Sequence, residues 1–276
     1  MKFKTYFLAA HLSLGLFSCQ SREKTGENLK EPKSCADFIT LGPTITELTV
    51  ALKANSRLLA VSRYDDLPEV ADKPRVGGIF DPEIERITAL NPACLFYIPS
   101  GAGLEMRLTP LRKAGQIRVI PIDIPNIDAI PGALSKLGKL LNLQDNALLL
   151  RENFKSTQQA LKTSAAKKEK KLRAVTVYGL MPLVVAGRGS MGHELMTLAG
   201  LENPIEKESY PVIDEEYFIS LKPDLVFDLS HQEGGERLKR LLSPNTRLIT
   251  LNAEELRHPS LNSLSVWQKE LKELGL

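Results

Sequence analysis

The chain has 276 residues, of which 43% are hydrophobic and 25% charged, and its formal net charge is +3. This length is enough for two domains of ordinary size, and the composition is that of a globular protein. So small a net charge excludes the broad basic field that nucleic-acid binding needs.

The first eighteen residues are predicted to be a secretory signal. Lys2 and Lys4 precede an apolar run that is too short for a stable transmembrane span. Leu16-Phe-Ser-Cys19 resembles a lipoprotein cleavage box, in which the cysteine is lipidated and becomes the new N-terminus. Phe17 is bulkier than the usual residue there, so a plain signal peptide is the alternative. Loss of two lysines with this segment lowers the formal charge from +3 to +1.

Residues 19–35 are polar and charged and read as a lipidated tether between the membrane and the folded protein. The first lobe is expected over residues 36–142. Its elements alternate between strands and helices, and the predicted ranges are strand 38–41, a helix after Gly42-Pro-Thr44, strand 58–61, helix 83–90, strand 94–98, a helix to Ala114, strand 118–122 and helix 127–141. Thr44 and Glu47 are predicted to form a capping box, and Asp81 is the expected cap of helix 83–90.

Residues 143–171 contain no Gly or Pro and predict one long bridging helix, from about Asp145 to about Lys168. Asp145 is its expected cap. An apolar stripe at helical spacing comprises Ala147, Leu148, Leu150, Arg151, Phe154 and Leu161.

The second lobe, residues 172–276, repeats the plan of the first. Residues 89–100 align without a gap on residues 220–231, and the same register places Glu105 on Glu236. Residues 117–123 match 246–252 after a two-residue slip. A hairpin is expected before Gly187, and a C-terminal helix over 261–274 carries Trp267. This repeat predicts two similar α/β lobes with parallel sheets.

Three cysteines are present. Cys19 belongs to the signal, while Cys35 stands just before the first predicted strand and Cys94 begins another. Export would allow these two to pair, but spacing alone does not fix connectivity, and unpaired thiols are the favoured expectation.

Ligands of parallel α/β sheets gather outside the carboxyl ends of the strands. The loops there offer aromatic and apolar surface beside small residues, which suits a large, flat, partly apolar ligand grasped between the lobes. The candidate ligand contacts are Tyr64, Gly78, Phe80 and Ser100 in the first lobe and Met181, Arg188, Tyr210 and His231 in the second.

Gly187-Arg-Gly-Ser-Met-Gly192 fits G-x-G-x-x-G, but a dinucleotide site also needs a preceding parallel strand and an acidic residue about twenty positions on. A tight turn into a helix is therefore the favoured interpretation, and Arg188 with the free amides there could hold an anionic group. Histidines are scattered, and nothing stands at metal-ligand spacing. The sequence offers no case for catalysis. We therefore expect that the protein is not an enzyme, has no cofactor and has no set of residues that binds a metal ion.

Several motifs together resemble the periplasmic binding proteins of cobalamin and ferric-siderophore importers. They are Ile39-Thr-Leu-Gly-Pro-Thr-Ile-Thr-Glu47, Val61-Ser-Arg-Tyr-Asp-Asp-Leu-Pro68, Val76-Gly-Gly-Ile-Phe-Asp-Pro82, Leu90-Asn-Pro92, Val185-Ala-Gly-Arg-Gly-Ser190, Glu194-Leu-Met-Thr-Leu-Ala-Gly-Leu-Glu-Asn203 and Leu221-Lys-Pro-Asp224. The resemblance implies two Rossmann-like lobes joined by one long helix, with the ligand in a cleft between them and little closure on binding.

In this family a glutamate on each lobe docks to arginines of the membrane permease, which implies that role for Glu105 and Glu236. The expected ligand is a cobalt or iron chelate, with cobalamin favoured over a ferric siderophore and haem third. Tyr64 with Asp65, Asp66 and Pro68 is similar to the cobalamin branch, although Asp65 and Leu67 depart from its pattern. A bare divalent-metal receptor and a nucleotide-binding enzyme are the alternatives. We further expect an exported monomer that is anchored by its lipid, docks on an ABC permease dimer and binds no nucleic acid.

Overall fold

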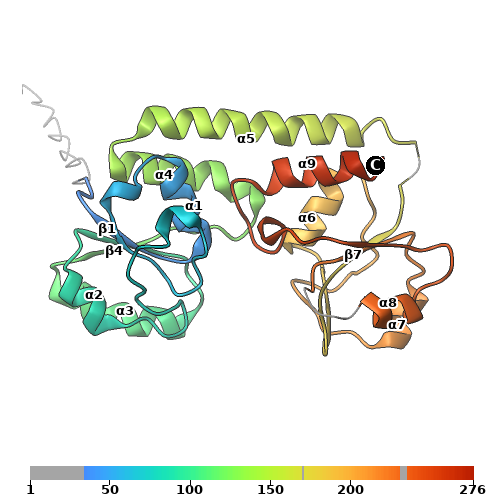
Figure 1. Cartoon of the computed structure of the whole chain (residues 1–276), viewed down its shortest axis with the longest axis horizontal. Helices are drawn as coiled ribbons and strands as arrows, with labels where there is room; N and C mark the ends of the chain where they lie inside the picture. Colours follow the sequence, from blue (N-terminus) through green and yellow to red (C-terminus); the bar gives the residue numbers. More distant parts are fainter. Residues whose placement is uncertain (1–33, 170, 231–234) are drawn as a thin grey trace, which may run out of the picture. The chain divides into compact units, whose positions relative to one another are not determined.

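The computed structural model describes residues 34–169, 171–230 and 235–276. These residues form two α/β lobes, each built on a four-stranded sheet, and helix α5 (Gln144–Ala165) connects them (Figure 1). The expected fold class is therefore confirmed. The predicted signal and most of the predicted tether lie outside the described residues. Within the described ranges, every helix is too short or too polar to cross a membrane.

The sheet of the first lobe is parallel throughout, with strand order β2-β1-β3-β4. Connections between parallel strands need a crossover, and helices supply most of them here. The elements are β1 (Phe38–Leu41), α1 (Pro43–Ala51), β2 (Leu58–Ala60), α2 (Ile84–Leu90), β3 (Cys94–Tyr97), α3 (Ala102–Ala114), β4 (Arg118–Pro121) and α4 (Ile130–Leu141), with short 3₁₀ turns η1 (Asn55–Arg57), η2 (Pro68–Val70) and η3 (Ile127–Ala129).

The second lobe has the corresponding order, β6-β5-β7-β8. Strand β6 runs antiparallel to β5 because only Met181 and Pro182 connect them, as the predicted hairpin requires. The elements are β5 (Ala174–Leu180), β6 (Leu183–Val185), α6 (Met191–Leu198), α7 (Glu215–Ser220), β7 (Leu225–Asp228), α8 (Gly235–Leu241), β8 (Arg247–Thr250), η4 (Glu254–Leu256) and α9 (Ser263–Glu273). The matching strand orders confirm the internal repeat.

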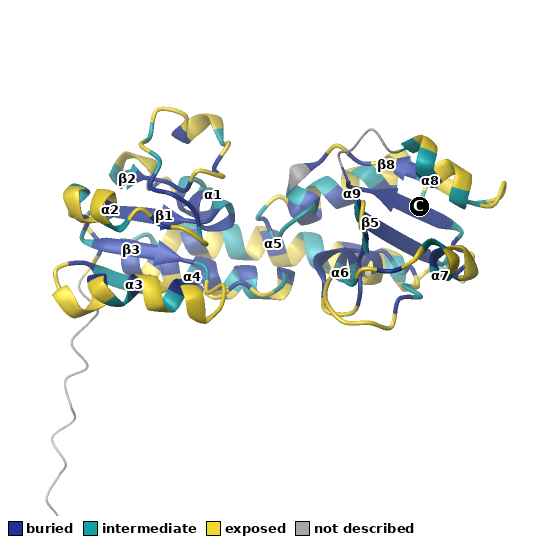
Figure 2. Cartoon of the chain, turned by 90° about the horizontal axis from the view of Figure 1, so that it is seen from below, coloured by how far each residue is buried: buried dark blue, intermediate teal, exposed yellow. Residues whose placement is uncertain are grey.

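Both faces of each sheet are covered. Neighbouring strand residues point to opposite faces, so Phe38 and Ile39 enter different apolar clusters. The cluster that holds Phe38 continues through Phe154 of α5 to Trp267 of α9. Strands that are buried on both sides read as unbroken apolar runs, which is why the sequence located them well. The buried strands and the exposed outer faces of the helices are visible in Figure 2.

Helix α5 packs against α4 of the first lobe and against α6 and α9 of the second. It begins one residue before Asp145, with Leu143 as its N-cap, so the prediction that Asp145 caps it is wrong. Asp145 lies instead in the first turn, where its charge favours the helix dipole. Of the predicted apolar stripe, Ala147, Phe154 and Leu161 are buried, whereas Leu148 is exposed.

Two other predicted caps are also wrong, and in both cases a tertiary partner takes the side chain. Helix α2 has Glu83 as its N-cap, and Asp81 pairs with Arg63. Thr44 and Glu47 lie in α1 as expected, but both side chains bond to residues 259–262, far along the chain. A local capping pattern does not reveal such distant competitors.

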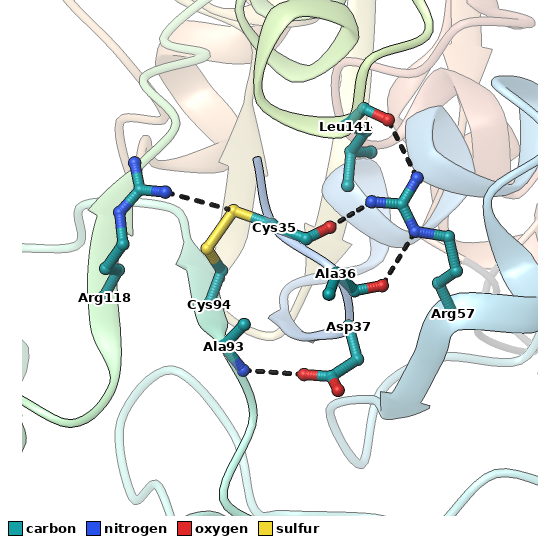
Figure 3. The surroundings of a disulfide bond; sticks show 8 residues. All are labelled: Cys35, Ala36, Asp37, Arg57, Ala93, Cys94, Arg118 and Leu141. Atoms are coloured by element: carbon teal, nitrogen blue, oxygen red, sulfur yellow. Dashed lines mark hydrogen bonds between the residues drawn. A yellow bond between two sulfur atoms is a disulfide. The ribbon is translucent and has the colours of Figure 1, made fainter. Parts of the chain in front are cut away.

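Cys35 and Cys94 form a disulfide, so the expectation of two unpaired thiols is wrong (Figure 3). The cause is the strand order. Strands β1 and β3 are neighbours and Phe38 is level with Cys94, which brings the chain before β1 within a Cα–Cα distance of 5.6 Å, inside the usual range for a disulfide. Arg57 donates to the carbonyls of Cys35, Ala36 and Leu141 and holds the incoming segment in place.

Candidate ligand-binding site

On the first lobe, two loops that follow β2 are joined into one surface. The Arg63 amide donates to the Gly77 carbonyl at 2.8 Å, and the Arg63 guanidinium lies 2.9 Å from the Asp81 carboxylate. The Tyr64 ring packs on Gly78, where an added Cβ would stand 2.5 Å from the ring. Any side chain at position 78 would therefore displace the Tyr64 ring. We call this surface, with Phe80, the first-lobe face.

The first-lobe face presents apolar groups to solvent. Tyr64 is 50% exposed and Phe80 69% exposed, although both are large aromatic residues. The next residue along, Asp65, turns inward and accepts a hydrogen bond from the Ser62 hydroxyl. Burial raises the pKa of Asp65 above its usual value. Ser100 lies exposed in the turn between β3 and α3.

On the second lobe, the loop after β6 pairs with the segment before Tyr210. The Gly187 amide donates to the Ser209 carbonyl, and the Ser209 amide donates to the Arg188 carbonyl, both at 2.8 Å. An added Cβ at Gly187 would lie 2.1 Å from the Lys207 carbonyl oxygen, so only glycine fits there. Arg188 is exposed beside this pairing.

Tyr210 lies in the loop before α7, and its side chain contacts the first residue of α6. Its hydroxyl accepts from the Met191 amide at 3.3 Å, and its ring meets that of Tyr178 edge-on at 5.1 Å. Burial raises the pKa of Tyr210, yet 44% of the residue stays exposed. We call Arg188, Tyr210, Met181 and Val212 the second-lobe face.

Met181 is 74% exposed at the tip of the hairpin, and Val212 is 56% exposed beside it. Both line a groove of about 470 Å³ with Asp214, Glu215 and Arg237. Val212 was absent from the predicted contacts because a lone valine after a proline carries no distinctive sequence signal. The predicted contact His231 lies outside the described residues.

The interpretation of residues 187–192 as a turn into a helix is confirmed, with Ser190 as the N-cap of α6. The Ser190 hydroxyl accepts from the His193 amide, and the Met191 amide is taken by Tyr210. Fewer amides are therefore free for an anion than the sequence suggested. His193 lies on the helix face, with its ring 3.2 Å from the Asn203 side chain. Across the described residues, no three His, Cys, Asp or Glu side chains are grouped to hold a metal ion.

The two glutamates proposed for docking occupy equivalent places. Glu105 lies in the first turn of α3 and Glu236 in the first turn of α8. The Glu105 carboxylate accepts from the Tyr97 hydroxyl at 2.7 Å and pairs with Arg112 at 2.8 Å. Glu236 is paired with Lys239 at 2.7 Å. These contacts hold the pKa of each carboxyl below its usual value, through the Tyr97 hydroxyl first for Glu105 and through Lys239 for Glu236.

The sequence profile of the family described as periplasmic binding protein matches residues 39–245. The chain belongs to this family. A vitamin B12-binding protein of Salmonella paratyphi A is 31% identical over 204 residues, which cover 73% of this chain and 74% of that protein. The members of the family are binding proteins of transport systems, not enzymes.

Solved structures agree with the fold. The periplasmic vitamin B12 binding protein BtuF of Vibrio cholerae superposes with a TM-score of 0.75 at 23% identity, covering 88% of this chain and 98% of that one. The periplasmic heme binding protein HutB of Vibrio cholerae gives 0.74 at 22% identity, with 86% and 98% covered. At these identities the likeness establishes the architecture alone.

The structure therefore packs Tyr64 on Gly78 in the first lobe and pairs Arg188 with the segment before Tyr210 in the second. Phe80 and Met181 are exposed on the same two lobes. That the two faces hold one ligand between them stays a prediction, as do the roles of the individual residues.

Proposed function

We propose that this chain is the substrate-binding protein of an ABC importer and that its substrate is cobalamin. The observation that carries the proposal is the exposed apolar surface on both lobes. Tyr64, Phe80, Met181 and Tyr210 leave 44–74% of their surface to solvent. Large side chains of this kind are normally buried, so their exposure in loops at the strand ends supports a large, partly apolar ligand. The B12-binding relatives support the choice of cobalamin.

Haem and a ferric siderophore are the competing substrates. Similar structures include heme binding proteins, which keeps haem in the test. A catecholate siderophore favours several convergent arginines. Both Arg63 and Arg188 are exposed here, but Arg63 is already paired with Asp81 at 2.9 Å. This pairing favours a ligand of lower negative charge, such as cobalamin.

A thermal melt with a panel of chelates tests the substrate. The chain from Gln20 onward is melted alone and with an excess of cyanocobalamin, haemin or a ferric siderophore. Ligand at a hundred times its dissociation constant adds about 2.7 kcal/mol and raises Tm by several degrees. We expect the shift with cyanocobalamin. A shift with haemin alone would identify haem, not cobalamin, as the substrate of this site.

Variants locate the site. Tyr64→Ala and Tyr210→Ala each remove a half-exposed ring from one face and should reduce the cobalamin shift. Leu149→Ala is the matched control, because Leu149 is 64% exposed on α5, outside both faces. Equal shifts in all three variants would place the ligand elsewhere.

We further propose that Glu105 and Glu236 dock on arginines of the permease. Equivalent positions on the two lobes would present two carboxylates to a two-fold symmetric permease, and such charges orient a complex. Glu105→Lys with Glu236→Lys should abolish uptake and leave chelate affinity unchanged. Glu152→Lys with Glu273→Lys makes the same charge change on α5 and α9 and should leave uptake intact. Loss of uptake in both pairs would reveal a general charge effect instead.

We also propose that Cys19 carries the lipid and that the residues between it and Cys35 form the tether, which ends before Cys35 because that residue is buried and bonded to Cys94. Intact mass of the membrane-bound protein should include the lipid, and Cys19→Ser should release the chain into the soluble fraction. A soluble protein without lipid in both forms would identify a plain signal peptide.

A further inference from the structure

The first helix after the leading strand or hairpin of each lobe contains the same short pattern. The pattern is a glycine, four intervening residues and then Glu-Leu. It runs from Gly42 to Leu48 in the first lobe and from Gly189 to Leu195 in the second. Glu47 lies in α1 and Glu194 in α6, and the two sheets share one strand order, so the glutamates are structural equivalents.

Glu47 reaches from the first lobe to the start of α9 in the second. Its carboxylate accepts from the Ser260 hydroxyl at 2.9 Å, the Leu261 amide at 3.1 Å, the Asn262 amide at 3.3 Å and the Asn262 side chain at 3.0 Å. The first amides of a helix lack partners within it and favour negative charge. The Thr44 hydroxyl adds a bond to the Pro259 carbonyl at 2.7 Å.

Glu194 makes the reverse contact. Its carboxylate accepts from the Ile127 amide at 2.9 Å, at the first residue of η3, which runs into α4 of the first lobe. Helices α4 and α9 are the last helices of their lobes. Burial raises the pKa of both Glu47 and Glu194, and the bonds that they accept lower it in part. Both residues are half-buried where one lobe contacts the other.

We propose that Glu47 and Glu194 are reciprocal clamps that set the spacing of the two lobes. Each clamp joins the first helix of one lobe to the last helix of the other, so separation of the lobes breaks both. A rotation that opens one contact strains the other. Helix α5 also connects the lobes, through its packing on α4, α6 and α9, and the two clamps add a restraint away from that helix. The inference concerns the chain without ligand and goes beyond the proposed function.

Inter-lobe distance distributions from paired electron spins test this. Ketone-bearing amino acids at the exposed positions Lys113 and Asn245, one on each lobe, take spin labels without touching the cysteines. The chain from Gln20 onward should give one narrow distribution. Glu47→Ala with Glu194→Ala should give a broader distribution with a longer mean distance, and each single variant an intermediate one.

Asp214→Ala is the matched control, because Asp214 caps α7 within the second lobe by accepting from the Tyr217 amide at 2.7 Å. It should lower stability and leave the distance unchanged. If the double Ala variant does not fold, Glu194→Ala, which loses a single bond, is decisive. An unchanged distribution in a folded Glu47→Ala or Glu194→Ala variant would overturn the proposal and reduce both residues to helix caps. The measured distance does not depend on chelate binding. The clamp proposal can therefore fail while the proposed function stands, and the reverse is also true.

Discussion

Removing the Cys35–Cys94 disulfide should lower the free energy of unfolding by about 4 kcal/mol. The bond joins residues 59 positions apart. In the chain-entropy description, cross-linking a loop of this length removes roughly 14 cal/mol/K from the unfolded state, which is about 4 kcal/mol at 25 °C. Both cysteines are completely buried, so the loss of sulfur volume adds a packing cost.

Urea unfolding of four proteins separates these contributions. They are the chain from Gln20 onward, Cys35→Ala, Cys94→Ala and the double variant, all without reductant. Because either single substitution already breaks the bond, each should lose nearly as much stability as the double variant. The coupling energy of the cycle should therefore be large and close to the loop-closure value.

Thiol titration of the unfolded, unreduced protein supplies an independent check and should find no free thiol in the unsubstituted chain. Two reactive thiols, together with single-variant losses that add up to the loss in the double variant, would refute the bond and the reasoning from loop closure.

Three further predictions concern single side chains. Gly78→Ala should displace the Tyr64 ring and weaken cobalamin binding about tenfold, or about 1.4 kcal/mol, in a titration, and unchanged affinity would remove Tyr64 from the site. Trp267→Ala should cost about 3–5 kcal/mol in urea unfolding, because the buried indole also donates to a backbone carbonyl of α6; a loss below about 1 kcal/mol would contradict its place in the core. The pKa of Glu105 is lowered, so as pH falls its carboxylate should stay charged below the ordinary pKa of 4.5. A carbon NMR titration of the Glu105 carboxyl should give a midpoint below 4.5, and Tyr97→Phe should raise that midpoint because it removes the hydroxyl donor. A midpoint unmoved by that substitution would dismiss the hydroxyl as the cause.

Much of the fold follows from the sequence because the central strands β1, β3 and β7 are buried on both sides. Apolar runs such as Cys94 to Tyr97 leave little choice of element, and their repetition at Leu225 to Asp228 indicates a second lobe of the same plan. The disulfide escaped prediction because pairing depends on which strands are neighbours.

The helix caps failed for a related reason. Glu47 satisfies the local pattern of a capping box, but the start of α9 offers it four donors that stand more than two hundred residues away in the chain. In the candidate site, Tyr64 and Tyr210 could be chosen because they lie in turn sequences. The burial of the Asp65 side chain could not be predicted, because it depends on the hydrogen bond from the buried Ser62 hydroxyl.

Calorimetric titration of the chain from Gln20 onward with cyanocobalamin tests the central claim most directly. The account predicts binding of one molecule per chain, lost or strongly weakened when Tyr64 and Tyr210 are both replaced by alanine. Absence of binding to cyanocobalamin, with a titratable site for haemin or a ferric siderophore instead, would contradict the assignment of cobalamin.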